Sequence, residues 1–421
     1  MRTIRTSPHM INARSGRTWE GSMKAIIGVT AGLCLLLSAC AQGPTRQRGP
    51  TFFPPLPQTP RVQFLTSISS EEDVGARRQS RFRDFVVGQS QGYKELGRLQ
   101  AIGHEPGKIY LVDKTIENIV SIDLETGEFD QFRDLKGGRL QNPVSVFVAP
   151  DGYKYVADVG RNQVVVYNER NEYSMTYAVA APFRPTDVVV YENRLYVSDF
   201  DGNQVIVIDR ATGETIRTIG GLGVDEGFFR RPTHLTIDDA GNLFVVDSMN
   251  FRIQMFDVDG EFVKTFGYYE AGPGGLARPK GIGVDRSGHL YSVDAAFEVI
   301  QIYDVRSTDP LLVWGRRGSG PGSTYLPADI AIDHENVEYF NQYADPKFKL
   351  KYLIYQSNQL GNNKLNVYGF GTWTGKSSDI PARQTGDTTE TIETPQNMPS
   401  LDDVMESEGD EPPEEPGKEP D

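Results

Sequence analysis

The sequence predicts an all-β protein whose body is a six-bladed β-propeller, followed by a disordered acidic C-terminal tail. Two observations lead to this fold class. A unit of 42 to 48 residues recurs along the chain, and each unit reads as four short strands separated by turns rich in glycine and aspartate. A repeat of this length with four strands is one propeller blade.

The repeat keeps a fixed spacing between a proline that opens each unit and an aspartate that ends its second strand. Successive prolines are 42, 47, 47 and 48 residues apart. Proline and aspartate are 15 residues apart in three units and 14 in the unit that begins at Pro185. The prolines are Pro143, Pro185, Pro232, Pro279 and Pro327, and the aspartates are Asp113, Asp158, Asp199, Asp247 and Asp294. A chance similarity would not hold this spacing.

The unit that begins at Arg231 shows the four strands most clearly. They read HLTID, LFVVD, RIQMFD and EFVKTFG, with period-two alternation and an Asp/Gly turn. The units before Pro143 and after Pro327 bring the number of blades to six. The last unit stops after three strands, so we expect Arg61–Ile68 (RVQFLTSI) to supply its fourth strand. Ring closure of this kind removes free sheet edges, and it predicts a propeller over residues 61–371.

The second and third strands of these units resemble the NHL-repeat family. The resemblance rests on the pairs LFVVD–RIQMF, LYSVD–VIQIY and KYVAD–QVVVY, and on the glycine-rich loops GLGVDEGFFRRP and GPGGLARP. It implies a six-bladed propeller and leaves the function open. The strand-ending aspartates read as structural, because each can accept hydrogen bonds from loop amides.

The N-terminus reads as a lipoprotein signal peptide over residues 1–39. The apolar run AIIGVTAGLCLLLSA follows Lys24, is short for a transmembrane helix, and ends in Leu37-Ser38-Ala39-Cys40. This ending resembles the bacterial lipobox, which implies cleavage before Cys40 and acylation of that residue. Met23 offers a second start. Ala41 after the cysteine favours the outer membrane, in either leaflet.

Charge and composition set further bounds. Residues 40–60 read as a Pro/Gly-rich tether, and residues 372–421 as a disordered tail. Leu401–Asp421 contains ten Asp/Glu and one Lys, and so carries −9 of the net −14. The totals show no broad positive field, so no nucleic-acid partner is expected. The two cysteines, Cys34 and Cys40, both precede the body, which therefore has no disulfide and no thiolate nucleophile.

Residues two past each proline should surround the mouth of the central channel. They are Ser145, Asp187, His234, Gly281 and Asp329, with Gln100 as the counterpart in the first unit. Asp187, His234 and Asp329 are suitable ligands for calcium or zinc. Propeller lactonases and amidating lyases use metals held by carboxylates or histidines, although this chain has only five histidines. Plain polar lining of a water-filled channel is the alternative.

A second candidate site is basic. The loops before the fourth to sixth units carry Arg230, Arg231, Arg278, Lys280, Arg316 and Arg317. Guanidinium groups suit carboxylates and phosphates, so these residues predict an anionic ligand or an acidic partner surface. They are equally compatible with loop packing.

Taken together, these features favour a membrane-tethered, extracytoplasmic binding scaffold that presents a loop face to a protein or glycan in the cell envelope. The alternative is a propeller hydrolase or lyase with a calcium or zinc ion at the channel mouth. Fold alone does not decide between them.

Overall fold

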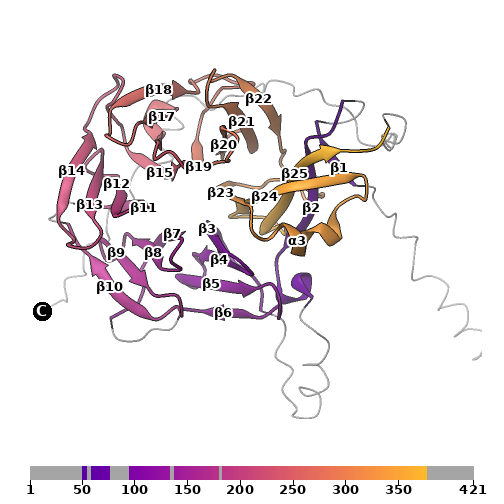
Figure 1. Cartoon of the computed structure of the whole chain (residues 1–421), viewed down its shortest axis with the longest axis horizontal. Coiled ribbons are helices and arrows are strands. Elements are labelled where there is room, and N and C mark those ends of the chain that lie inside the picture. The colour runs from indigo at the N-terminus through magenta and orange to yellow at the C-terminus, as the bar shows by residue number, and fades with distance from the viewer. Residues whose placement is uncertain (1–49, 55–57, 76–93, 133–136, 180–182, 377–421) are drawn as a thin grey trace, which may run out of the picture. The chain divides into compact units, whose positions relative to one another are not determined.

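The computed structural model describes residues 50–54, 58–75, 94–132, 137–179 and 183–376. The predicted signal peptide, Cys40 and the acidic tail lie outside these residues. Six antiparallel sheets surround a central axis, and the first strand of each repeat unit is innermost (Figure 1). The six-bladed propeller predicted from the repeat is confirmed.

Blades one to five are four-stranded sheets in which chain order runs from the innermost to the outermost strand. Blade one contains β3 (Leu99–Glu105), β4 (Lys108–Asp113), β5 (Asn118–Asp123) and β6 (Phe129–Gln131). Blade two contains β7 (Pro143–Val148), β8 (Lys154–Asp158), β9 (Gln163–Tyr167) and β10 (Tyr173–Tyr177), and blade three contains β11 (Pro185–Tyr191), β12 (Arg194–Asp199), β13 (Gln204–Asp209) and β14 (Thr215–Gly220). Blade four contains β15 (Pro232–Ile237), β16 (Leu243–Asp247), β17 (Arg252–Phe256) and β18 (Phe262–Phe266), and blade five contains β19 (Pro279–Val284), β20 (His289–Asp294), β21 (Val299–Asp304) and β22 (Pro310–Trp314). A short 3-10 turn, η1 (Glu71–Val74), precedes blade one, and another, η2 (Ser248–Asn250), follows β16.

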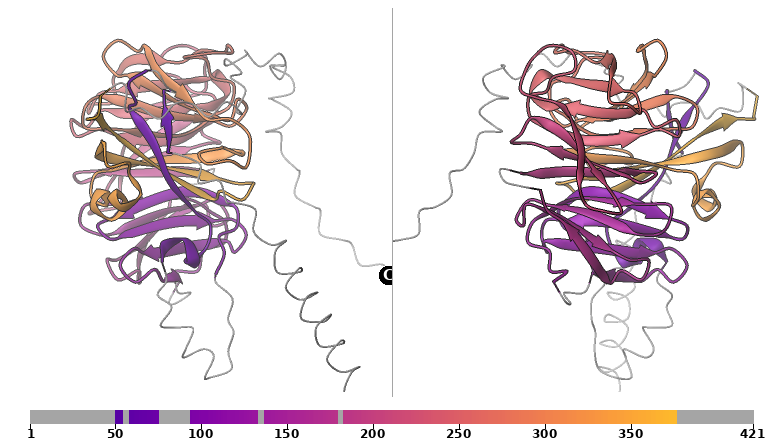
Figure 2. Two further views of the ribbon diagram at one scale, coloured as in Figure 1. Left: turned by 90° about the vertical axis from the view of Figure 1, so that its right-hand side faces the viewer. Right: turned by 60° about the vertical axis from the view of Figure 1, so that its left-hand side comes forward.

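Blade six joins the two ends of the propeller. It contains β23 (Pro327–Asp333), β24 (Phe348–Asn358) and β25 (Leu365–Trp373), with α3 (Val337–Phe340) and η3 (Asn341–Tyr343) inserted before β24. The predicted closing strand is present as β2 (Val62–Ile68), which pairs antiparallel with β25. Figure 2 shows this indigo strand beside the gold strands of the blade.

A fifth strand, β1 (Thr51–Phe53), pairs with the outer side of β2. It lies inside residues 40–60, which we expected to be an extended tether. The expected tether is therefore wrong for these three residues. Phe52 explains why the segment is ordered, since its ring packs on Phe348 and Trp373 with centroid separations of 5.6 Å to each. The sheet also continues to Trp373, two residues past the expected end.

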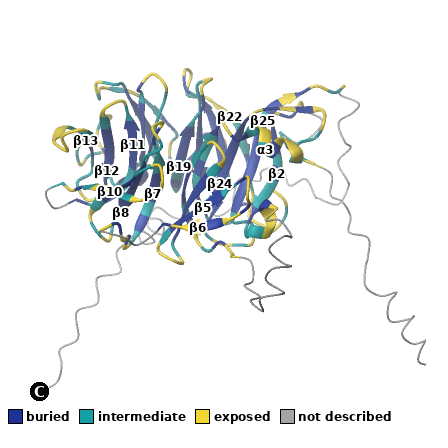
Figure 3. Cartoon of the chain, turned by 60° about the horizontal axis from the view of Figure 1, so that its bottom comes forward, coloured by how far each residue is buried: buried dark blue, intermediate teal, exposed yellow. Residues whose placement is uncertain are grey.

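The core consists of apolar clusters between neighbouring blades, one for each of the six junctions in the described chain. Both faces of every sheet are therefore covered, which explains why second strands such as LFVVD are apolar up to their final aspartate and fully buried. Exposed residues gather in turns and outer strands (Figure 3). Among the described residues, no helix has the length and apolar content needed to cross a bilayer.

The proline–aspartate spacing has a direct structural meaning. In blades two to five the opening proline pairs across the sheet with the aspartate that ends the second strand, as Pro143 does with Asp158. A bulge follows immediately after the proline. In blade one Leu99 takes the place of proline, and Ala101 occupies the position of Ser145. Our expectation that Gln100 holds this position is wrong by one residue, because no proline marks the start of that strand.

Candidate functional site

Three loops on one half of the propeller face have a common conformation. Residues 221–231, 267–278 and 315–326 precede blades four, five and six. They share one conformation, since each contains a parallel bridge at the same place: Leu222 with Phe229, Tyr268 with Gly275, and Arg317 with Thr324. All of them end at an innermost strand, so they lie on the same face as the channel mouth.

A buried amide side chain holds each loop against the blade that follows it. Gln254 on β17 accepts a hydrogen bond from the Gly227 amide (2.8 Å) and donates to the Phe228 carbonyl (2.8 Å). Gln301 on β21 contacts Gly274 and Gly275 in the same way, and Asn366 on β25 donates to the Ser323 carbonyl (2.9 Å). The three side chains are at most 1% exposed. The corresponding residues in blades one to three are Val120, Val165 and Ile206.

The side-chain amides of Gln254, Gln301 and Asn366 were not among the residues predicted from the sequence to matter for the site. A buried polar side chain is costly unless it is hydrogen-bonded, so a glutamine inside the apolar strand RIQMF needs a partner. The partner is the loop backbone. Blades four to six therefore display loops that are ordered before any ligand binds.

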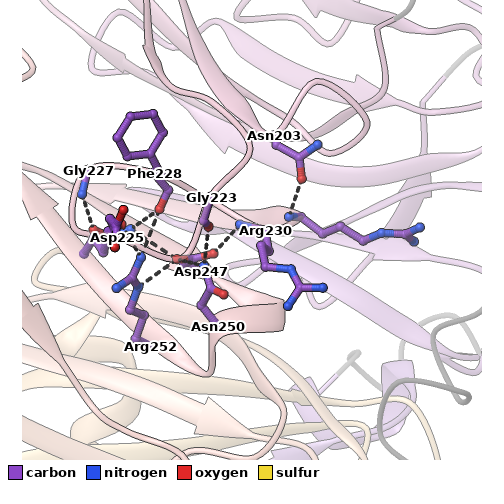
Figure 4. A network of polar contacts seen from close by, with 11 residues as sticks. Asn203, Gly223, Asp225, Gly227, Phe228, Arg230, Asp247, Asn250 and Arg252 are labelled. Carbon is purple, nitrogen blue, oxygen red and sulfur yellow. Dashed lines mark hydrogen bonds and ion pairs between the residues drawn. The ribbon is translucent and has the colours of Figure 1, made fainter. Parts of the chain in front are cut away.

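Asp247 anchors the first of these loops from below. Its carboxylate accepts hydrogen bonds from the Arg230 amide (2.7 Å), Arg252 Nε (2.8 Å) and Asn250 Nδ2 (2.8 Å). Arg252 in turn donates to the carbonyls of Asp225 and Phe228. Figure 4 shows this network beneath the loop. Burial is the largest influence on Asp247 and raises the pKa of its carboxyl.

The strand-ending aspartates are structural, as expected. Each is buried and accepts hydrogen bonds from backbone amides of the preceding loop: Asp113 from Gly97, Asp158 from Gln141 and Asn142, Asp199 from Arg184, Asp247 from Arg230, and Asp294 from Ala277 and Arg278. In blade six Asn358 takes this position opposite Pro327 and accepts from the Tyr325 amide (2.8 Å).

The loops held by the buried amides before blades four and five expose large apolar side chains. Leu222 is 73% exposed, Val224 62%, Phe228 46% and Tyr268 53%. The other exposed apolar residues in the described chain include Met175, Ile216, Val263 and Leu311, which are spread singly over the outer strands of four blades. Three of the four loop residues, by contrast, belong to the single loop before blade four. We call Leu222, Val224, Phe228 and Tyr268 the apolar loop patch.

The predicted basic residues lie on the loop face, with different environments. Arg231 has a positive φ of 56°, and its amide donates to Asn203 Oδ1 (2.9 Å). The Arg278 amide donates to Asp294 (2.8 Å), while Lys280 is half-buried on β19. Arg316 is exposed. Arg317 lies over the Tyr325 ring at 4.5 Å and forms an ion pair with Glu298 (3.9 Å).

At the channel mouth, two aspartates link successive blades. Asp187 accepts a hydrogen bond from the Ser145 hydroxyl of the previous blade and from the Leu235 amide of the next one (2.7 Å). Asp329 repeats the arrangement: it accepts from the Ile102 amide (2.8 Å) and fills the space beside Gly281, where a Cβ would lie 2.2 Å from its Oδ1. These contacts assign both residues a role in closing the ring.

Burial shifts the pKa values of the ionisable side chains at the channel mouth. Burial, opposed by the hydrogen bonds to Ser145, Leu235 and Val188, raises the pKa of Asp187 to about 6. Burial and then the charge of Asp187 raise the pKa of Asp329 well above its usual range. Burial, followed by the nearby Lys280, lowers the pKa of His234 to about 3.

The candidate metal ligands are not brought together. Within the described ranges, no three His, Cys, Asp or Glu side chains lie close enough to hold a metal ion. Asp187 and Asp329 are instead engaged by neighbouring blades, and Nδ1 of His234 is buried without a hydrogen-bond partner in the structure. The structure therefore does not assemble the Asp187, His234 and Asp329 group on which the calcium or zinc hypothesis depended.

A further buried carboxylate lies at the opposite end of the innermost strands and was not singled out from the sequence. Asp285 accepts hydrogen bonds from His289 Nδ1 (2.7 Å) and from the hydroxyl of Tyr352, which comes from the next blade. Burial alone would raise its pKa, but these hydrogen bonds outweigh burial and lower the pKa of Asp285 to about 2. This contact also ties neighbouring blades together.

Several solved structures share the fold at low sequence identity. A structural-genomics protein of unknown function from Bacteroides thetaiotaomicron has a TM-score of 0.51 and 16% identity, covering 73% of this chain and 75% of that one. A streptogramin B lyase has a TM-score of 0.45 and 15% identity, covering 66% of this chain and 85% of that one. Virginiamycin B lyase from Staphylococcus aureus, solved with quinupristin, has a TM-score of 0.46 and 14% identity, covering 65% of this chain and 95% of that one. No protein-family model matches the sequence. The similarity to the Bacteroides protein supports the propeller fold alone.

Proposed function

We propose that the protein is an exported, lipid-anchored binding scaffold that recognises a partner protein through the loop face of blades four to six. The observation that carries the proposal is the apolar loop patch: side chains 46–73% exposed on loops that buried amides hold in place. Exposed apolar side chains that cluster beside arginines are typical of protein interfaces. Because the loops are ordered beforehand, binding would lose less conformational entropy.

A protein partner is favoured over a glycan for the same reason. Leucine, valine and phenylalanine provide apolar contact area but no hydrogen bonds for sugar hydroxyls. The enzymatic alternative has less support, since the two mouth aspartates are already engaged in ring closure. The NHL-type repeat is compatible with either function.

The anchor completes the proposal. We infer acylation at Cys40 from the lipobox resemblance, and the position of β1 supports a short tether. Ten residues lie between Cys40 and Thr51, a span of at most about 40 Å in an extended chain. Acylation would therefore hold the propeller close to its membrane, with the outer membrane favoured. Cys40→Ser should release the protein into the soluble fraction after cell disruption.

The binding surface is tested by affinity capture from the protein's own membranes. The test variant carries Leu222→Ser, Phe228→Ser and Tyr268→Ser. The matched control carries Met175→Ser, Ile216→Ser and Leu311→Ser, which are 40–51% exposed on outer strands. We expect the test variant to lose a partner that the control retains. Retention by the test variant, or equal loss from both, would contradict the proposed surface.

A further inference from the structure

Three arginines beside the apolar loop patch present guanidinium groups with an incomplete set of partners. Arg184 and Arg231 both lie over the ring of Phe200, with guanidinium carbons 4.8 and 4.9 Å from its centroid. The loop that carries Arg231 also carries Arg230, whose amide is held by Asp247 while its side chain points away from that network (Figure 4). We call these three arginines the guanidinium cluster.

The guanidinium cluster has little compensating charge. Arg184 forms one ion pair, with Asp201 (3.9 Å), in which both side chains are at least 41% exposed. Within the described part of the chain, the guanidinium groups of Arg230 and Arg231 form no hydrogen bond or ion pair with a carboxylate. Each guanidinium has five donors in a planar fork that matches carboxylates. The cluster is thus suited to an anion-rich ligand.

We propose that this ligand is the chain's own acidic segment, Leu401–Asp421, and that it docks on the guanidinium cluster. The segment carries ten Asp/Glu and one Lys, which complements three neighbouring positive charges. It also contains Leu401, Val404 and Met405, which can contact exposed Phe228 in the same loop.

The segment is long enough to reach the site. The described chain ends at Lys376, about 35 residues before the middle of the acidic segment. Lys376 follows the end of β25 that lies opposite the loop face, in blade six, so the segment has to pass the edge of the propeller to reach blades three and four. Fully extended, 35 residues span at most about 120 Å, several times the roughly 20 Å length of a six-residue blade strand. Attachment to the same chain makes docking intramolecular, which raises the local concentration of the segment at the cluster.

A different basic surface lies closer to the end of the described chain. Lys349 and Lys351 are exposed on β24, in the blade from which the chain leaves. Lysine ammonium groups are more strongly hydrated than guanidinium groups and lack the bidentate fork. Arg184 and Arg231 also lie against the ring of Phe200, so their side chains have fewer conformations to lose when a ligand binds. We therefore assign the acidic segment to the arginines, and the lysines provide the control.

Docking has a consequence that rests on the proposed function. Arg230 and Arg231 belong to the same loop as Leu222, Val224 and Phe228, so a docked segment would cover part of the binding surface. A partner would have to displace it, and partner binding would rise with ionic strength at low salt. Docking itself does not depend on the existence of that partner.

The test uses a nitroxide spin label at Ser407→Cys in the full-length chain, with Cys34→Ser and Cys40→Ser so that one thiol remains. Electron paramagnetic resonance spectra report the immobilised fraction in about 20 mM and about 0.5 M NaCl, where the Debye length falls from roughly 20 Å to roughly 4 Å. The test variant is Arg184→Glu/Arg231→Glu and the control is Lys349→Glu/Lys351→Glu, with the same change in charge. Arg184→Gln/Arg231→Gln replaces the test variant if circular dichroism shows misfolding.

We expect an immobilised component at low salt that falls at least about threefold at high salt. The arginine variant should lose it at low salt, and the lysine variant should keep it. A mobile label at low salt in the otherwise unsubstituted chain would overturn the proposal. Immobilisation that survives the arginine variant, or that only the lysine variant removes, would overturn it as well. None of these outcomes changes the result of partner capture, so the two proposals fail separately.

Discussion

Replacing Phe52 with alanine tests whether the N-terminal strand β1 is part of the cooperative fold. Phe52 is 6% exposed and contacts Phe348 and Trp373, which pair with each other at one end of β24 and β25. Truncating a buried phenylalanine to alanine costs about 3–5 kcal/mol, because apolar contacts are lost and a cavity remains.

The expected change in melting temperature follows from the size of the body. The structure describes roughly 300 residues between Thr51 and Trp373. At about 2.1 cal/mol/K per residue, they have an unfolding entropy of about 0.6 kcal/mol/K. A loss of about 3–5 kcal/mol therefore lowers Tm by about 5–8 °C.

Differential scanning calorimetry of the intact chain measures this shift. Leu311→Ala is the control, because Leu311 is 51% exposed on an outer strand and its truncation should change stability by no more than about 0.5 kcal/mol. A Phe52→Ala shift below about 1 °C, equal to the control, would show that β1 detaches before the ring unfolds. The reasoning that places the fold boundary at β1 would then be refuted.

Two further predictions concern the loop clamp and the channel mouth. Gln254→Leu keeps a side chain of similar size but leaves the Gly227 amide without its partner and removes one of the two donors to the Phe228 carbonyl, at a cost of roughly 1–3 kcal/mol. Hydrogen exchange at Gly227 should accelerate, whereas Gly274, held by Gln301, is an internal control; unchanged exchange at Gly227 would contradict the clamp. At the mouth, burial raises the pKa of Asp187 to about 6, above its usual 3.8. The folded state therefore holds this proton more tightly than the unfolded state, so stability should fall as pH rises from about 4 to about 6. Asp187→Asn should remove that part of the pH dependence of Tm, and a Tm difference between the two proteins that does not vary with pH would argue against it.

Much of this architecture could be predicted from the sequence, and particular residues show which parts could not. Pro143 and Asp158 were expected to occupy fixed places in a blade, and they pair directly across it. Gln100 was misplaced by one residue, because blade one has Leu99 where the other blades have proline. Thr51–Phe53 was expected to be tether, since three residues among prolines and glycines show no alternation.

The candidate site was less predictable than the fold. Arg231 and Arg278 could be assigned to loops on one face from their place before a proline. The sequence could not show that Phe200 lies beneath both Arg184 and Arg231, because these residues come from two blades. Asp187, His234 and Asp329 belong to no group of three possible metal ligands among the described residues. The sequence could not show that Asp187 and Asp329 accept hydrogen bonds from neighbouring blades, because these contacts join different repeats.

By itself, the sequence determined the number of blades, the strand that closes the ring, and the face on which the arginines lie. Those properties follow from local or periodic patterns, and the same pattern recurs in successive repeats. Tertiary structure alone decided which groups meet across blade junctions and between distant strands of blade six, because such contacts depend on how the ring closes. Asp187 meets the Leu235 amide and Asp329 meets the Ile102 amide across junctions. Phe52 meets Trp373 within blade six, where the two ends of the propeller join.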